Sequence, residues 1–331
     1  MLLAIRFKPN ILGLLSRPGR DFLLKALPPH GILVATNEEI RDMRTAITDT
    51  APGEWQRWRE VLGAIPKCAR SLPCDRLADV APVLNLPTLF VVPANLAARL
   101  QSEAGLPADG EPFLVLSGDL PCEVVPGDAL VGSALLTERQ SWSNGTLHGG
   151  SSREALWDRL SPILRHASHV VLCDRYLLEQ AADLVANPGR SNGLSWLLAH
   201  MAAGDGIGGA TVEVFSQIPD PPHDGHHEIE DMAAEIHSRL RPKADSVTVH
   251  AVDRRRFARL VHGRTIRLGG TMINRLVTVD NSISAFDQTH LTASVSFSYR
   301  NVFGQELATI KALEDQLRRL CLDDLGPVTR R

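Results

Sequence analysis

The feature that most constrains the fold is an alternation of short apolar segments with segments of helical periodicity between residues 153 and 252. The apolar segments predict strands at His169–Cys173, Thr211–Ile218 and Ser246–Val252. The segments between and before them predict helices around 153–165, 194–201 and 229–240. Strands separated by helices favour a mainly parallel sheet that is covered on both faces, so we predict an α/β fold for this region.

The pattern becomes richer in strands after residue 252. Phe257–Leu268 and Met272–Val279 flank a Gly269-Gly270 turn and predict a β-hairpin, and Ala293–Tyr299 predicts a further strand. Gln305–Leu322 has the apolar spacing of an amphipathic helix. The C-terminal half should therefore form a mixed sheet with helices on both faces.

The N-terminal part of the chain has a different pattern, and a length of 331 residues suggests two domains. It is helical in outline to about residue 81 and strand-rich over 82–142, where Thr88–Val92, Phe113–Leu116 and Ala129–Leu136 predict strands. The polar, glycine-rich stretch Ser143–Ser152 predicts a linker. We therefore expect a separate α+β domain over 1–150, with no role that the sequence assigns, and the α/β domain over 151–331.

Cysteine usage and hydropathy narrow the class of protein. The five cysteines are odd in number and never spaced as C-x-x-C, which argues against a disulfide framework and a structural zinc site. The same cysteine usage makes a reducing cytoplasm the expected compartment. No apolar run reaches the length of a transmembrane helix, so we expect a soluble protein. The glycines at 204, 206, 208 and 209 follow a helix instead of a strand, which argues against a dinucleotide site. The acidic, histidine-containing stretch 219–235 reads as a polar loop, and we predict neither metal nor cofactor.

Charge is unevenly distributed along the chain. Residues 239–275 hold ten Lys or Arg and two Asp, a charge of +8, which leaves −11 for the rest of a chain whose net charge is −3. Because arginine matches phosphate oxygens in geometry and charge, this block predicts a phosphate-binding face. The candidate ligands are Arg254, Arg255, Arg256, Arg259, Arg267 and Arg275.

His262 and Arg264 are the candidate catalytic pair within that block. Residues two apart on a strand share a face, so these side chains should project together. An imidazole beside a fixed cation suits a phosphodiester, since histidine can attack phosphorus or move protons while the cation neutralises oxygens. Asp280, Asn281 and Ser282, which follow the next predicted strand, are weaker catalytic candidates.

The stretch from about residue 161 to 287 resembles the phospholipase-D-like domain found C-terminal to MIT domains, and more loosely the phospholipase D superfamily. Residues 167–176 are similar to the family's opening strand, which ends in aspartate-x-tyrosine at Asp174, Arg175 and Tyr176. Residues 262–266 are similar to its histidine-aspartate-arginine-x-isoleucine strand, and residues 280–286 to its glycine-leucine-aspartate-x-phenylalanine segment.

The departures from the catalytic members bear on activity. Those members have lysine where this chain has Arg264 and aspartate where it has Gly269, and they use two histidine motifs, of which one is visible here. The MIT-associated relatives are regarded as non-catalytic binders. The resemblance therefore implies a phospholipase-D-like fold that binds phosphodiesters without cleaving them.

Three functions from different classes follow from these observations. The favoured one is a module that binds nucleic acid or another phosphorylated ligand, as a subunit of a bacterial assembly with partner proteins; a phage-defence setting follows by analogy. The second is a nuclease or other phosphodiesterase with His262 as nucleophile in a site shared by a homodimer. The third is a structural interaction protein that binds partner chains through its acidic N-terminal half and the helix 305–322, with a buried histidine.

Overall fold

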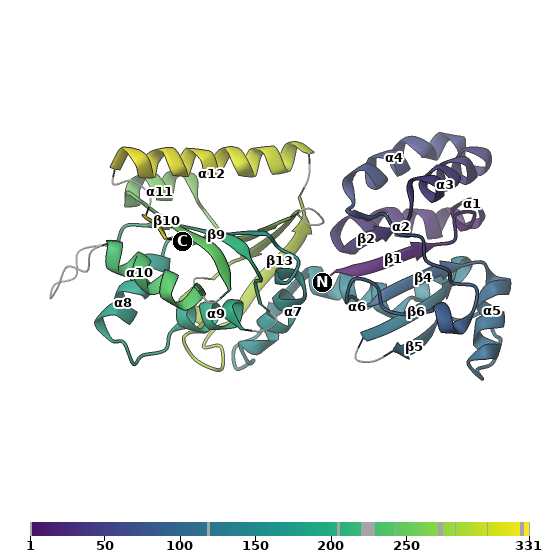
Figure 1. The fold of residues 1–331 in the computed structure, drawn as a ribbon, viewed down its shortest axis with the longest axis horizontal. Helices are drawn as coiled ribbons and strands as arrows, with labels where there is room; N and C mark the ends of the chain where they lie inside the picture. Colours follow the sequence, from purple (N-terminus) through teal and green to yellow (C-terminus); the bar gives the residue numbers. More distant parts are fainter. Residues whose placement is uncertain are drawn as a thin grey trace. The chain divides into compact units, whose positions relative to one another are not determined.

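The computed structural model of the chain describes residues 2–117, 120–203, 206–219, 229–241, 243–270, 274–281, 283–302, 304–324 and 328–330. The chain divides into two compact units, Met1–Ser143 and Asn144–Arg331 (Figure 1). Each unit is built on a mixed β-sheet with helices packed against it.

The N-terminal unit has a six-stranded sheet in the order β3-β2-β1-β4-β6-β5. Its strands are β1 (Leu3–Phe7), β2 (Gly31–Val34), β3 (Lys67–Cys68), β4 (Thr88–Val92), β5 (Phe113–Ser117) and β6 (Leu120–Pro126). The first five strands in the order are parallel, and β5 at the edge is antiparallel to β6.

Helices cover both faces of this sheet (Figure 1). One face packs against α1 (Ile11–Leu14), α2 (Arg17–His30), α3 (Asn37–Thr50), α4 (Trp55–Ala64) and α6 (Ala134–Ser143). The other face packs against α5 (Ala94–Glu103). Short 3-10 helices η1 (Pro52–Glu54), η2 (Leu77–Asp79) and η3 (Gly127–Gly132) complete the unit.

The expected helical character of residues 1–81 is wrong, because β1 and β2 lie in the middle of the sheet. Both strands are buried along their whole length, so they lack the alternation that marks a half-exposed strand.

The strand expected at 129–136 is also wrong. The Glu123 carboxylate accepts hydrogen bonds from Ser133 Oγ and from the N–H groups of Ala134 and Leu135, and so fixes the start of α6 there. The strands at Thr88–Val92 and Phe113–Leu116 are confirmed.

The C-terminal unit has an eight-stranded sheet in the order β14-β10-β9-β8-β11-β12-β13-β7. Its strands are β7 (Asn144–Leu147), β8 (His169–Cys173), β9 (Ala210–Gln217), β10 (Ala244–Val252), β11 (Arg264–Gly269), β12 (Asn274–Val279), β13 (Val295–Asn301) and β14 (Val328–Arg330). β8, β9 and β10 are parallel, whereas β11, β12, β13, β7 and β14 pair with their neighbours in antiparallel fashion. The prediction of a mixed sheet is confirmed.

Helices lie on both sides of this sheet as well (Figure 1). On one side are α7 (Glu154–Leu164), α8 (Leu177–Ala186), α9 (Gly193–Ala202), α10 (Ile229–Leu240) and the 3-10 helix η4 (Ile283–Phe286). On the other are α11 (Arg254–Leu260) and the long α12 (Gly304–Asp324), which pack on Val171, Phe215 and Val252.

Two expectations for this unit are corrected. The strand expected from Phe257 does not begin there: residues 254–260 form the helix α11, because Asp253 Oδ1 accepts the N–H groups of Arg255 and Arg256, each at 3.0 Å, as a helix cap. The stretch 143–152 is not a free linker: β7 pairs with β13, and the Gly150 N–H donates to the Leu291 carbonyl at 2.7 Å. The unit therefore begins at Asn144.

Candidate functional site

Three segments that the sequence singled out meet at one end of the C-terminal sheet. β11 runs antiparallel to β8, which places Thr265 opposite Cys173, so the residues after β8 lie beside those that begin β11. β12 pairs with the other side of β11 and places Val279 opposite Arg264. Residues 174–176, 262–264 and 280–281 are thereby gathered from distant parts of the chain. Ser282 lies outside the described residues.

A polar pocket of about 110 Å³ opens where these segments meet. We call it the arginine pocket; it is lined by Arg175, Phe257, Ala258, Val261, His262, Gly263 and Arg264. Because one water needs about 10–15 Å³ of cavity volume, the space can hold several water molecules or one small group. No carboxylate is among these lining residues of the described chain. The pocket is therefore suited in size and charge to one small anionic group.

Tyr176 holds the two arginines of the pocket. The guanidinium carbon of Arg175 lies 4.9 Å from the centre of the Tyr176 ring, and that of Arg264 lies 5.9 Å from the same centre, both within cation–π range. Arg264 also donates from a terminal nitrogen to the Asp280 carbonyl at 3.0 Å. By contrast, the Nε of Arg175 is buried and has no hydrogen-bond partner among the described residues. Arg175 thus lines the arginine pocket and has one buried donor that makes no hydrogen bond among the described residues.

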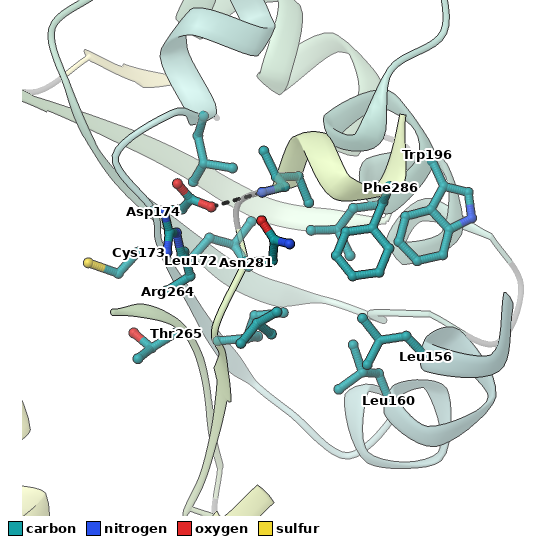
Figure 2. A pocket seen from close by; sticks show the side chains of 15 residues that line it. Leu156, Leu160, Leu172, Cys173, Asp174, Trp196, Arg264, Thr265, Asn281 and Phe286 are labelled. Atoms are coloured by element: carbon teal, nitrogen blue, oxygen red, sulfur yellow. Dashed lines mark hydrogen bonds between the residues drawn. The ribbon is translucent and has the colours of Figure 1, made fainter. Parts of the chain in front are cut away.

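Asp174 anchors the loop that carries Arg175. Its carboxylate accepts the N–H groups of Tyr176 at 2.9 Å and of Ile283 at 3.2 Å; the second bond is dashed in Figure 2. Burial raises the pKa of Asp174, and the two hydrogen bonds and the nearby Arg264 charge oppose that rise. Asp174 does not line the arginine pocket. Its role in the structure is to tie the end of β8 to η4.

Figure 2 shows a separate apolar cavity, which shares the residue Arg264 with the arginine pocket. It measures about 40 Å³ and is walled by Leu156 and Leu160 of α7, and by Trp196 and Phe286, whose rings stack 5.4 Å apart. Arg264 lines both spaces. This cavity is too small for a ligand of ordinary size. We interpret it as the packed support of the arginine pocket.

The remaining catalytic candidates do not line the arginine pocket. Asp280 is exposed, and its carboxylate accepts the Ser296 N–H at 2.7 Å, which fixes the start of β13. Asn281 lines the apolar cavity. His262 lies in the turn before β11 and not within the strand; it is exposed and does line the arginine pocket.

The basic block does not form one phosphate-binding face. Arg267 is three residues from Arg264 and therefore lies on the opposite side of β11, where it is 3% exposed and donates to both Glu314 oxygens at 2.5 and 2.6 Å. Arg275 is fully buried, and its Nε donates to the Tyr299 hydroxyl at 2.8 Å. Both were expected to bind phosphate, and both expectations are wrong. Arg254, Arg255, Arg256 and Arg259 are exposed on α11.

A second charged cluster, which the sequence did not reveal, lies on the far side of the sheet beneath α12. Glu213 on β9 accepts a bond from His169 at 2.9 Å and two from Arg318 of α12 at 2.9 and 3.0 Å, and lies 3.4 Å from a nitrogen of His250. Burial alone would raise the pKa of Glu213, but the bonds from His169 and His250 and the Arg318 charge bring it far below its usual range. Because Arg318 comes from a helix 105 residues away in sequence, no local pattern could have predicted this cluster.

This lowered pKa predicts a pH dependence. A carboxyl whose pKa is lower in the folded state stabilises the fold above its unfolded pKa of about 4.3, and this stability is lost as the pH falls further. We expect Glu213→Gln to lower the free energy of unfolding by about 2 kcal/mol at pH 7 and to reduce the loss of stability between about pH 5 and pH 3. Urea unfolding at several pH values measures both effects. Glu179→Gln, on the exposed side of α8, is the control and should leave the pH profile unchanged.

The described residues contain no cluster of three or more His, Cys, Asp or Glu side chains that could hold a metal ion. The histidines at 223, 226 and 227 lie outside the described residues. Within the described chain, no helix is both long and apolar enough to cross a membrane. Comparison with known protein families and with characterised proteins finds no match to this chain.

Proposed function

We propose that the C-terminal unit is a phospholipase-D-like module that binds a phosphodiester group in the arginine pocket without cleaving it. The observation that carries the proposal is the pocket itself: two guanidinium groups and one imidazole line a space of about 110 Å³ with no carboxylate among the described lining residues. The three segments that carry the resemblance to phospholipase-D-like domains also lie at this end of the sheet, which supports the same proposal.

The buried Nε of Arg175, a residue of the pocket lining, supports the binding of a ligand here. A buried donor without a partner costs free energy, and a phosphate oxygen would remove that cost. The planar guanidinium fork matches two phosphate oxygens at once, which gives a charge-assisted pair. Arg264 is already held by Tyr176 and the Asp280 carbonyl, so little side-chain entropy is lost when it contacts the ligand.

The same geometry favours binding of a phosphodiester without its cleavage. Displacement at phosphorus needs a nucleophile and a group that protonates the leaving oxygen. His262 is the one described lining residue that can do either, and Asp174 is engaged by two backbone N–H groups outside the pocket. Cleavage would require a second histidine from a partner subunit. Binding without cleavage and cleavage by a dimer are therefore two alternatives that experiment can distinguish.

Arg175→Gln should weaken binding of a fluorescently labelled single-stranded thymidine oligonucleotide by about tenfold or more. The reason is that one hydrogen bond to a charged group contributes about 1.5–3 kcal/mol. Fluorescence anisotropy at several salt concentrations measures the affinity, and the slope of log affinity against log salt should become shallower by about one.

Arg259→Gln is the matched control for that variant. It removes the same charge from the exposed surface of α11, on the side that helical spacing turns away from the pocket residues Ala258 and Val261. We expect it to change the affinity by no more than about twofold. Equal losses in the two variants would show diffuse attraction to surface charge and would contradict a pocket centred on Arg175.

A further inference from the structure

The N-terminal unit has a polar pocket of its own, with a volume of about 410 Å³. We call it the switch-point pocket; it is lined by Lys8, Asn10, Asp75, Pro93, Asn95, Leu96 and Arg99. Its volume is within the range of roughly 300–1,000 Å³ that small-molecule sites occupy. It belongs to residues 1–143 alone and shares no lining residue with the arginine pocket.

The sheet topology explains why a pocket forms at this place. β1 and β4 are parallel neighbours, with Phe7 opposite Val91, but the chain leaves them in opposite directions. After β1 it enters α1 and α2 on one face of the sheet, and after β4 it enters α5 on the other face (Figure 1). Such a divergence leaves a crevice outside the carboxyl ends of the two strands, which is where open α/β sheets bind ligands. Lys8 and Asn10 follow β1, and Pro93 and Asn95 follow β4.

The charges of the pocket point to an anionic ligand. Lys8 Nζ lies 2.9 Å from the Asp75 carboxylate, and a terminal nitrogen of Arg99 donates to the Asp75 backbone carbonyl at 2.6 Å. The lining therefore has two cations and one carboxylate. The Asp75 side chain is 57% exposed, so an incoming anion could displace it from Lys8 at little cost.

We propose that the switch-point pocket binds the phosphate group of a small phosphorylated molecule, with Lys8 and Arg99 as the charged contacts. The side-chain oxygen of Asn95 accepts the Leu96 N–H at 2.9 Å, which fixes this amide and leaves its NH₂ group as a donor to the ligand. Asp75 competes with the ligand for Lys8. This competition distinguishes a binding site from an ion pair that merely stabilises the fold, because removal of the carboxylate should then strengthen binding.

The experiment uses inorganic pyrophosphate as the probe and the full chain with Arg175→Gln and Arg264→Gln as the background. These two changes remove the arginine pocket, so binding by the N-terminal unit is measured separately from the function proposed above. Isothermal titration calorimetry should show one pyrophosphate per chain. Lys8→Gln should weaken that binding at least tenfold, Arg99→Gln should also weaken it, and Asp75→Asn should tighten it severalfold.

Lys25→Gln, at an exposed position on α2, is the matched control and should leave the affinity unchanged. The proposal is overturned if pyrophosphate does not bind, if Lys8→Gln behaves like Lys25→Gln, or if Asp75→Asn weakens binding as Lys8→Gln does. Circular dichroism reports whether each variant folds. Arg99, whose side chain is 57% exposed, supplies a second decisive variant should Lys8→Gln fail to fold.

Discussion

Replacing Arg267 with methionine should lower the free energy of unfolding by about 3–5 kcal/mol, the usual cost of breaking a buried ion pair. Arg267 and Glu314 are 3% and 6% exposed, and the Nε and one terminal nitrogen of Arg267 donate to the two Glu314 oxygens, at 2.5 and 2.6 Å. Without Arg267 the Glu314 carboxylate keeps, among the described residues, the ion pair with the more distant Arg318, 3.8 Å away, and must either stay charged with little compensation or take up a proton. Urea unfolding followed by tryptophan fluorescence measures the loss.

Two further variants test whether the loss of stability comes from the buried ion pair or from removing any positive charge. Arg300→Met breaks a pair with Glu306 whose side chains are 56% and 44% exposed, and this change should cost less than about 1 kcal/mol. Combining Arg267→Met with Glu314→Leu should restore most of the stability, since apolar residues often replace a buried ion pair without net loss. If Arg267→Met costs no more than Arg300→Met, the pair contributes nothing to the fold and our description of it is wrong.

This pair also shows what the charge block could and could not predict. The ten cations between residues 239 and 275 suggested one surface, but residues three apart on a strand lie on opposite faces. The sequence alone therefore predicts that Arg264 and Arg267 lie on opposite faces of their strand. The partner of Arg267 was not, because Glu314 comes from a helix 47 residues further along the chain. Net charge therefore located a region but not a binding face.

The fold was predictable where the hydrophobic pattern of the sequence changes from strand-like runs to helical spacing. The strand His169–Cys173 and the helix Ile229–Leu240 were predicted with the bounds that the structure has, because apolar runs of strand length alternate with helical spacing there. The first strand, Leu3–Phe7, was missed. It contains Arg6, which is 3% exposed and bonds to Glu39 and to the carbonyls of Val34 and Leu72. A charged residue whose partners are all distant makes a buried strand look like part of an amphipathic helix.

The site was predictable as a set of segments but not as a pocket. The resemblance to phospholipase-D-like domains grouped Asp174–Tyr176 with His262–Arg264, and the pairing of β8 with β11 does bring them together. Which side chain carries an unsatisfied donor depends on burial, so sequence patterns gave Arg175 no priority over the six arginines of the block that were candidate phosphate ligands. The helix α11, which supplies one wall, was missed because its last four residues, 257–260, were read as the start of a strand.

Removal of both arginines of the pocket should give the largest effect on binding. With about 1.5–3 kcal/mol for each charged contact, Arg175→Gln combined with Arg264→Gln should weaken binding of the labelled oligonucleotide by about 100-fold or more. The two losses should not be strictly additive, because both guanidinium groups rest on Tyr176 and the loss of one lets the other move. Anisotropy titrations of the two single variants and the double variant form the cycle that measures this coupling.

Arg175→Lys tests whether geometry matters in addition to charge. Lysine keeps the positive charge but lacks the planar fork, so we expect an affinity between those of the wild-type protein and Arg175→Gln. Full retention of affinity in Arg175→Lys would show that a positive charge at this position is sufficient, and it would contradict bidentate binding. Thermal unfolding of each variant checks that a loss of affinity is not a loss of fold, which matters most for Arg264, because its bond to the Asp280 carbonyl also joins two strands.

The same titrations, extended in time, decide between binding and cleavage. A module that only binds leaves the oligonucleotide intact on a denaturing gel, and His262→Ala then weakens affinity by a few-fold because one contact to the ligand is lost. A phosphodiesterase would instead release shorter products with the wild-type protein and lose that activity in His262→Ala while retaining affinity through Arg175 and Arg264. Since a second histidine would have to come from another chain, such activity should also rise with the square of protein concentration at low concentration, where dimers are scarce.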